Sequence, residues 1–269
     1  MFRSPSGTGC IITLTTDFGL DDAYAAVMKG VILDTCPAAN IVDISHSVQP
    51  QNIAEAAFLL RSAYPYFPVG TIHCAVVDPG VGTARRPIAI RANRGMLVGP
   101  DNGIFTHVVL EDGLVDRDGS LLSGGAVELV ASEFRRAEMS QTFQGRDIFA
   151  PAAAHLGLGV PLRNLGPTVK EIHLLDLPVP RMTAGVVHGC IIHIDRFGNA
   201  ISNITVEVTP RVARVIVNGT EIEGLSRSYQ EKDIVAIFGS IGFLEIAARN
   251  GSAAHRLGLQ VGDSIQVSP

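Results

Sequence analysis

The run TIHCAVV at residues 71–77 decides the fold, because it is almost entirely apolar or β-branched and ends in the carboxylate of Asp78. A strand of this kind is typical of the buried interior of a parallel sheet. Shorter β-prone runs precede it at residues 11–15 and 41–44, and a helical pattern separates each run from the next. The order strand, helix, strand, helix, strand predicts an α/β N-terminal domain with a largely parallel sheet.

The helical patterns around these strands are less uniform. Asp21 and Asp22 precede the first helix, where an Asp side chain can accept backbone N–H groups, and we expect its buried stripe to consist of Ala23, Val27, Val31 and Ile32. The other elements expected in this domain are a helix over 53–60, strands at 88–90 and 96–98, a turn over 99–105 that leads into a helix, and an Ala-rich helix over 148–156.

The sequence Leu-Pro-Val-Pro at 177–180 indicates a linker, because two prolines one residue apart favour extended backbone and stop a helix. We therefore expect an N-terminal domain over 1–177, a linker over 178–182 and a C-terminal domain over 183–269. Beyond the linker, short strands are predicted at 186–194, 204–208, 215–217, 234–238, 243–248 and 264–267. With a hairpin signal at Asn218-Gly219, this spacing predicts a small all-β barrel or sandwich.

Two carboxylates follow predicted strands of the N-terminal domain. Asp17 and Asp78 lie where ligands gather in parallel sheets, at the carboxyl ends of the strands, so both should face one crevice. Arg85 follows Asp78 across a Gly-rich turn that lets the backbone double back. We therefore predict an Asp–Arg pair that faces a cleft.

Composition narrows the class of function. The chain has 269 residues and a formal net charge of −5, and its Lys and Arg residues form no dense run, so a nucleic-acid partner is not expected. No apolar run is long enough for a membrane span, and the first ten residues lack a secretory pattern, so we expect a cytoplasmic protein with a small-molecule ligand. The four cysteines lack C-x-x-C spacing and the eight histidines lack close ligand spacing, so no metal site is expected.

Six blocks resemble the S-adenosyl-L-methionine hydroxide adenosyltransferases, which are relatives of the fluorinases and chlorinases. The resemblance runs nearly end to end, and six blocks in the same order are more specific than any one of them. The blocks are TTDFG at 15–19, VDPGVGT at 77–83, PDNG at 100–103, GRDIFAPAA at 145–153, DRFGN at 195–199 and LEIA at 244–247.

The resemblance implies hydrolysis of S-adenosyl-L-methionine to adenosine and L-methionine, by attack of water or hydroxide on the ribose C5′, without a cofactor. The family handles water with an Asp, an Arg and a His, which places the first two roles on Asp78 and Arg85. The third position holds Gln144. A glutamine can orient water but cannot take up a proton at neutral pH, and loss of a general base costs on the order of 10²- to 10⁴-fold in rate.

The resemblance also implies how the substrate is anchored. Asp17 corresponds to the acid that holds the ribose hydroxyls, Asn199 to an adenine contact, and Asp195 and Ser240 to groups around the methionine end. Glu245 and the backbone near Ala248 lie where the family surrounds adenine, although Arg249 replaces an expected Asn. The family further implies a homotrimer, with each site between the N-terminal domain of one subunit and the C-terminal domain of its neighbour.

Three alternatives remain open at this stage. The chain could be a halogenase-type enzyme, although a carboxylate beside the nucleophile site would repel a halide ion and so favours hydroxide chemistry. It could be a catalytically impaired protein that binds S-adenosyl-L-methionine or adenosine, because of Gln144. Individual residues could also be structural: Asp17 as a helix cap, Asp78 as a turn residue, and Arg146 with Asp147 as an ion pair.

Overall fold

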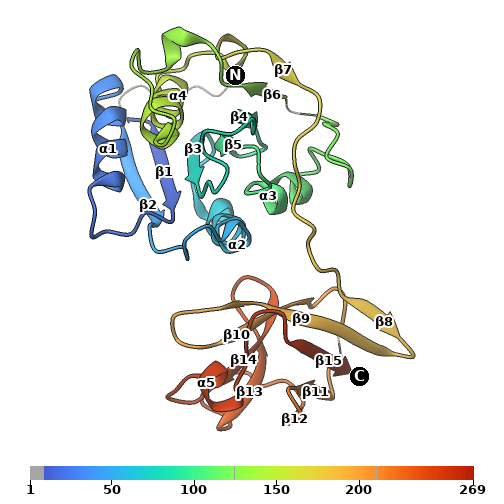
Figure 1. The fold of residues 1–269 in the computed structure, drawn as a ribbon. Helices are drawn as coiled ribbons and strands as arrows, with labels where there is room; N and C mark the ends of the chain where they lie inside the picture. Colours follow the sequence, from blue (N-terminus) through green and yellow to red (C-terminus); the bar gives the residue numbers. More distant parts are fainter. Residues whose placement is uncertain (1–8, 124, 210) are drawn as a thin grey trace. The chain divides into compact units, whose positions relative to one another are not determined.

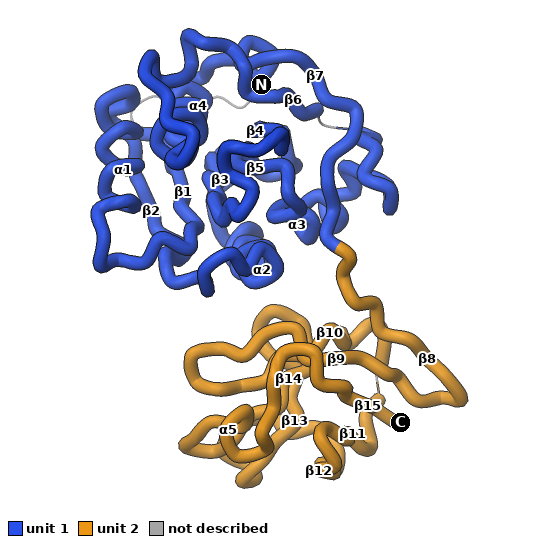
Figure 2. The backbone as a smooth tube through the Cα atoms, in the orientation of Figure 1, with its two compact units in different colours: residues 1–175 blue, residues 176–269 orange. Residues whose placement is uncertain are grey.

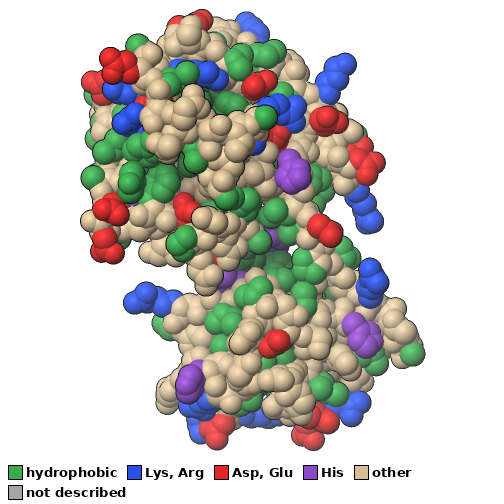
Figure 3. Space-filling view, in the orientation of Figure 1, with side chains coloured by type: hydrophobic (Ala, Val, Ile, Leu, Met, Phe, Trp, Pro, Cys, Tyr) green, Lys and Arg blue, Asp and Glu red, His purple; other side chains and the backbone are tan. Residues whose placement is uncertain are grey.

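The computed structural model describes residues 9–123, 125–209 and 211–269. The chain divides into two compact units, residues 1–175 and residues 176–269 (Figure 2). Among the described residues, no helix combines the length and apolar character needed to cross a bilayer. On the face seen in Figure 3, basic and acidic side chains are interspersed and leave no broad basic surface in view.

Unit 1 contains a seven-stranded sheet in the order β2-β1-β3-β5-β4-β6-β7. The first four strands in this order pair in parallel, and the other pairings are antiparallel. The predicted α/β class with a parallel central region is therefore confirmed, with an antiparallel extension at one edge. The strands are β1 (Ile11–Thr16), β2 (Asn40–Ser45), β3 (Thr71–Val76), β4 (Pro87–Arg91), β5 (Gly95–Pro100), β6 (Ala126–Glu128) and β7 (Thr168–Val169).

Helices cover both faces of this sheet and give three layers (Figure 1). Cys74 and Val76 pack into the core beneath α1 and α4, whereas Ala75 and Val77 pack into the core beneath α2 and α3. Every residue of β3 is buried, because successive side chains point to opposite faces and both faces are covered. The helices are α1 (Tyr24–Thr35), α2 (Ile53–Ala63), α3 (Thr106–Glu111) and α4 (Ala150–Gly157), with 3₁₀ turns at Tyr64–Tyr66, Ser132–Phe134 and Leu162–Asn164.

Helix α1 differs from its predicted form. It begins at Tyr24 after Ala23, and no side chain caps it, so the prediction of an Asp cap was wrong. Its buried residues are Ala25, Met28 and Ile32 instead of the predicted stripe, of which Ile32 alone is buried. The helix is apolar around most of its circumference, so the pattern could not select the face that packs on the sheet.

The last helix of unit 1 starts earlier than predicted and in a different form. A π-helical turn, η3 (Gly145–Phe149), precedes α4. Single π-helical turns within helices are frequent at functional sites. Here the turn lies directly after Gln144 and contains the buried carboxylate of Asp147, which accepts hydrogen bonds from Arg146 Nε at 2.6 Å and Nη2 at 2.9 Å.

Unit 2 is an antiparallel sheet in the order β12-β11-β15-β9-β10-β14-β13, with β8 paired to β9. The two ends of this order, β12 and β13, approach each other, so the sheet nearly closes into the predicted barrel. The elements are β8 (Arg181–Thr183), β9 (Val186–Ile194), β10 (Ala200–Thr205), β11 (Arg214–Val217), β12 (Thr220–Glu223), β13 (Ile234–Phe238), β14 (Phe243–Ala248), α5 (Ala253–Leu257) and β15 (Ser264–Ser268).

Two details of unit 2 bear on the sequence analysis. Asn218 and Gly219 have φ values of 45° and 75° at the tip of the hairpin between β11 and β12, as a type I′ turn requires. The strand predicted at 204–208 is wrong, because β10 spans 200–205 and the chain then turns. Its apolar residues Ala200 and Ile204 pack into the core of the barrel, whereas Val206 is exposed, so the run of β-branched residues was misleading.

Candidate functional site

The site lies where the chain order of the parallel sheet reverses. From β1 the chain passes through α1 to β2 on one side, and β3 then pairs on the other side of β1. Thr16 at the end of β1 lies opposite Val76 at the end of β3, so Asp17 and Asp78 both follow the carboxyl ends of these neighbouring strands. Such a reversal point forms a crevice beyond the strand ends, which is where ligands bind in open α/β sheets.

A pocket of about 230 Å³ occupies this crevice. Its lining includes three residues predicted from the sequence, Asp17, Asp78 and Gln144, and also Phe18, Gln51, Thr142 and Phe143, which the predictions missed. Phe18 and Phe143 stand in or beside quoted sequence blocks, and their rings meet edge to face with centroids 5.8 Å apart. A larger hollow of about 510 Å³ lies beside α1 and α4 and contains none of the predicted site residues.

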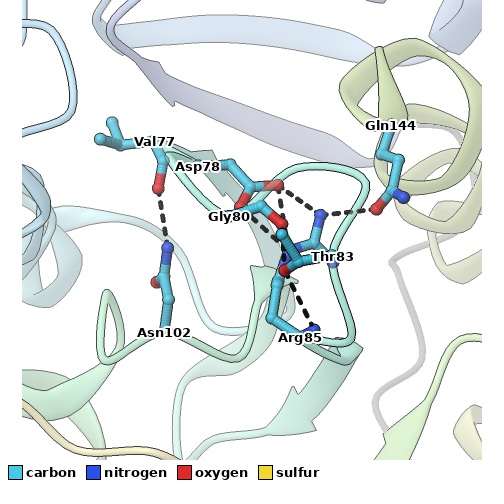
Figure 4. Close-up of polar contacts among 7 residues, drawn as sticks. All are labelled: Val77, Asp78, Gly80, Thr83, Arg85, Asn102 and Gln144. Atoms are coloured by element: carbon cyan, nitrogen blue, oxygen red, sulfur yellow. Dashed lines mark hydrogen bonds and ion pairs between the residues drawn. The ribbon is translucent and has the colours of Figure 1, made fainter. Parts of the chain in front are cut away.

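Arg85 connects Asp78 to Gln144 (Figure 4). Its Nε lies 2.9 Å from Asp78 Oδ1 and 3.1 Å from Oδ2, and its Nη2 contacts both Asp78 Oδ2 and Gln144 Oε1, the latter at 2.5 Å. The two charged side chains are only 10% and 6% exposed. The guanidinium also lies over the Phe149 ring, 5.2 Å from its centroid. Two segments far apart in the sequence, the loop between β3 and β4 and residues 144–149, therefore contribute to one group of contacts.

The loop between β3 and β4 holds this group in place. Gly82 has a φ of 77°, and a Cβ there would lie 2.8 Å from the backbone oxygen of Gln141, so only glycine fits without strain. Thr83 Oγ1 donates a hydrogen bond of 2.6 Å to the Gly80 carbonyl, which tightens the turn. Asn102 Nδ2 donates to the carbonyl of Val77 at 2.9 Å and so fixes the residue before Asp78.

The orientation of the Gln144 amide follows from its partner. A guanidinium has only donors, so the amide oxygen must face Arg85 and the NH₂ group is left as a donor at the pocket. Arg85 Nη1 is buried and has no partner among the described residues. The group therefore combines a paired carboxylate with N–H donors that can orient a small polar molecule.

Asp17 is half-buried at the pocket and does not cap α1. Its Oδ2 accepts a hydrogen bond of 2.8 Å from the backbone N–H of Gln51, in the loop before α2. Gln51 has a φ of 67°, which is uncommon for a residue other than glycine and frequent at functional sites. The sequence carried no signal for Gln51, because its backbone supplies the contact.

The remaining predicted residues belong to unit 2. Asp195 accepts hydrogen bonds of 2.9 Å from the backbone N–H groups of Phe197 and Asn199 and from the Asn199 side chain, so these two predicted residues stabilise one loop. Ser240 is exposed in the turn between β13 and β14, and Ala248 is buried at the end of β14.

Glu245 is a buried carboxylate in β14. It accepts a hydrogen bond of 3.1 Å from Tyr229, a residue that the sequence analysis missed. Burial raises the pKa of Glu245, and the nearby charge of Asp195 acts in the same direction. A Cβ at position 239 would lie 1.4 Å from Glu245 Oε1, so any larger residue there would displace the Glu245 carboxylate.

No group of three or more His, Cys, Asp or Glu side chains able to hold a metal ion occurs within the described ranges.

Comparisons with known proteins agree with the resemblance seen in the sequence. The SAM hydroxide adenosyltransferase N-terminal domain matches residues 12–166, and the C-terminal domain of the same family matches residues 189–266. The (R)-S-adenosyl-L-methionine hydrolase of Salinispora tropica is 39% identical over 265 residues, covering 96% of this chain and 97% of the relative. The (R)-S-adenosyl-L-methionine hydrolase of Thermus thermophilus is 42% identical over 255 residues, covering 94% of this chain and 97% of the relative.

More distant relatives and solved structures extend this picture. A fluorinase of Nocardia brasiliensis is 28% identical over 302 residues, covering 97% of this chain and 98% of the relative. The crystal structure of an uncharacterized conserved protein from Thermotoga maritima aligns with a TM-score of 0.87 at 34% identity, covering 96% of this chain and 100% of the other. The crystal structure of a conserved hypothetical protein from Thermus thermophilus aligns with a TM-score of 0.76 at 38% identity, covering 96% of this chain and 99% of the other.

Proposed function

The chain belongs to the SAM hydroxide adenosyltransferase family, and from this premise we propose that it is an (R)-S-adenosyl-L-methionine hydrolase. The products are adenosine and L-methionine. Water or hydroxide forms a bond to the ribose C5′ while the C5′–S bond breaks, and the bonding electrons leave with sulfur as a neutral thioether. One proton is released from the attacking water.

The observation that carries this proposal is that Asp78 and Gln144 line one pocket with Asp17 and are joined to each other, behind the pocket lining, by hydrogen bonds from Arg85. A sulfonium is already a good leaving group, so the protein must mainly place the nucleophile opposite the C–S bond and limit its hydration. Asp78 and the N–H donors of Arg85 and Gln144 orient the water. Asp17 accepts hydrogen bonds from the ribose hydroxyls, for which a carboxylate is a natural partner.

Hydroxide chemistry is favoured over halogenation for two reasons. The hydrolase relatives are more similar to this chain than the fluorinases are. In addition, Asp78 is largely buried beside the nucleophile position, and its charge opposes a halide ion more strongly than it would in water. We therefore expect no halogenated adenosine product in the presence of chloride.

We further propose that Asn199, Glu245 and the backbone at Ala248 contact adenine and that Ser240 and Asp195 lie at the methionine end. Asp195 already accepts three hydrogen bonds within its loop, so any contact with substrate uses a remaining lone pair or replaces one of these bonds. The active form is a homotrimer, in which unit 1 of one subunit and unit 2 of its neighbour share each site.

The testing experiment follows adenosine and methionine by chromatography after incubation with the (R) and (S) forms of the sulfonium, with and without chloride. The variants are Gln144→His and, as a matched control, Gln141→His, an exposed residue outside the pocket lining. We expect adenosine from the unmodified chain and from both variants. Chlorinated adenosine would support the halogenase alternative instead.

The Gln144→His variant also tests what position 144 does. A neutral imidazole can copy the amide, accepting from Arg85 with one nitrogen and donating from the other, so turnover should stay within about tenfold of the unmodified chain. A gain of about 10²-fold or more would show that proton acceptance is missing and that this chain is an impaired enzyme. Tight binding of S-adenosyl-L-methionine with no product from the unmodified chain would favour a binding protein.

A further inference from the structure

A line of polar contacts among residues outside the pocket lining reaches the end of β1. Thr16 Oγ1 lies 2.8 Å from His46 Nδ1, and His46 Nε2 lies 3.0 Å from Asp43 Oδ1. Asp43 in turn pairs with Lys29 of α1 at 2.6 Å. Thr16 is fully buried and His46 is 4% exposed, so their polar atoms depend on one another for partners.

The direction of these contacts can be assigned. A carboxylate only accepts, so Asp43 favours the proton on His46 Nε2, although this N–H is not aligned well enough to form a regular hydrogen bond. Nδ1 then accepts from the Thr16 hydroxyl. The oxygen of that hydroxyl lies 3.3 Å from the backbone N–H of Phe18 and accepts from it. The line therefore ends on the backbone directly after Asp17.

His46 makes a second contact with the same turn. Its backbone carbonyl accepts a hydrogen bond of 2.8 Å from the N–H of Gly19. The side-chain contacts thus hold Thr16 and Phe18, the two neighbours of Asp17, and the His46 carbonyl holds Gly19. Gln51, in the same loop, donates to the Asp17 carboxylate itself at 2.8 Å.

We propose that His46 is a positioning residue that acts through Thr16 and Gly19 to hold Asp17 in the orientation that binds the ribose hydroxyls. This inference rests on the proposed function, in which Asp17 contacts the substrate. His46 itself does not line the pocket. Loss of the Thr16–His46 contact is therefore expected to weaken substrate binding and leave the chemical step nearly unchanged.

The chain offers a matched control for this proposal. Thr13, in the same strand, makes an equivalent buried contact, with its Oγ1 2.9 Å from His73 Nδ1, but lies away from the pocket. Thr16→Val and Thr13→Val remove the same hydroxyl and nearly preserve volume. Thr16→Ser keeps the hydroxyl.

The test compares KM and kcat for these three variants with the unmodified chain. Because the lost hydrogen bond orients the anchor, Thr16→Val should raise KM about tenfold with kcat within about twofold, and Thr16→Ser should stay close to the unmodified chain. Thr13→Val should lower stability without changing KM. Equal KM values for the two Val variants would overturn the proposal.

A second arm separates this proposal from the proposed function. Titration calorimetry with adenosine measures ribose binding without turnover, so it reports on Asp17 even where no hydrolysis is seen. Thr16→Val should weaken adenosine binding in the unmodified background and have no further effect in an Asp17→Asn background, since the two residues act in series. Additive effects of the two substitutions would overturn the positioning role. Adenosine binding without adenosine release would instead count against the hydrolase function alone.

Discussion

Asp78 and Arg85 form a buried ion pair beside the pocket. Both side chains are largely buried, so each charge has lost most of its hydration and relies on its partner. A pair of this kind contributes little net stability, but removing one partner leaves an uncompensated charge. Single substitutions in this pair should therefore be destabilising, at the position where we propose that the nucleophile is oriented.

Arg85→Met should lower turnover by about 10²-fold, because an oriented donor is lost, and should destabilise the fold by about 3 kcal/mol, because Asp78 is left unpaired. The double variant Asp78→Asn with Arg85→Met should recover part of the stability and none of the activity. Urea denaturation and adenosine release measure the two effects. Arg86→Met serves as the control, since Arg86 pairs with Asp101 outside the pocket. Equal losses of turnover in both arginine variants would contradict the assigned role.

His73 provides a prediction for pH. It is 1% exposed in β3, and burial lowers its pKa from 6.5 to about 4. The unfolded chain therefore takes up a proton below about pH 6.5 while the folded chain does not, so stability is fully present above that pH and falls as the pH drops toward 4. At about 1.4 kcal/mol per pKa unit, His73 lowers the free energy of unfolding by on the order of 3 kcal/mol once the pH has fallen to about 4.

The measurement for His73 is the free energy of unfolding in urea at several pH values between 8 and 4. His73→Gln should flatten this pH dependence, and the value at pH 8 reports the change in packing alone. Some dependence should remain, because burial and the charge of Arg61 also lower the pKa of His107 to about 4. An unchanged pH dependence in His73→Gln would show that His73 titrates normally in the folded chain.

For single residues, the sequence predicted four side chains that the structure brings together at or beside the pocket, and their chemical roles stay predictions. Asp17 and Asp78 followed from their positions after strands, and Arg85 and Gln144 from spacing and from the resemblance. It did not predict Gln51, since a backbone N–H has no side-chain signature. The sequence also did not predict that Asp195 and Asn199 are hydrogen-bonded to each other. Their assignment to different ends of the substrate stays a prediction.

Among the elements, the loop between β2 and α2 contributes more than its sequence suggested. Gln51 sits at a φ of 67°, which costs a residue with a Cβ roughly 1 kcal/mol. In this conformation the Gln51 backbone N–H donates a hydrogen bond to Asp17, the proposed substrate anchor, so the strain accompanies a contact at the pocket.

Gln51→Gly should therefore stabilise the fold by at most about 0.5 kcal/mol, because relief of roughly 1 kcal/mol of strain only slightly exceeds the roughly 0.5–1 kcal/mol of entropy gained by the unfolded chain. The backbone N–H is retained, so KM should change little. Gln49→Gly is the matched control, since Gln49 has no positive φ, and it should be neutral or destabilising. Thermal or urea denaturation decides between these outcomes, and a loss of stability in Gln51→Gly would show that its side chain outweighs the strain.

The elements also show where sequence patterns stop being informative. Short apolar runs located most strands of unit 1, because burial on both faces leaves a continuous apolar signature in a strand such as β3. Helical patterns located most of its helices. The buried face of α1 was predicted wrongly because that helix is apolar nearly all round. The π-helical turn before α4 had no signal, since it depends on packing and not on residue type.

For the whole molecule, the alternation of strands and helices followed by short strands was sufficient to predict an α/β unit and a nearly closed antiparallel unit. The antiparallel edge formed by β4, β6 and β7 was not predicted, because strand direction at an edge depends on connections that local patterns do not encode. Assembly likewise stays a prediction.

The proposed trimer makes a quantitative prediction. Light scattering should give three times the chain mass of 28.5 kDa. Asp78→Asn in one chain and Asn199→Ala in another should each abolish activity, but random co-assembly should restore about a quarter of it, because that fraction of shared sites combines two intact units. No recovery in a verified mixed trimer would show that each site draws on one subunit alone.

The segment between β3 and β4 has an evolutionary consequence. Residues 77–86 carry Asp78 and Arg85 yet lie outside every strand ladder of the sheet. Substitutions or changes of length there leave strand register intact, provided that Asn102 and Gly82 keep their contacts. A lineage built on this scaffold can therefore vary these ten residues, and with them the part of the pocket formed by Asp78, Pro79 and Val81, while the strand pairings and the part formed by Asp17 and Gln51 are inherited unchanged.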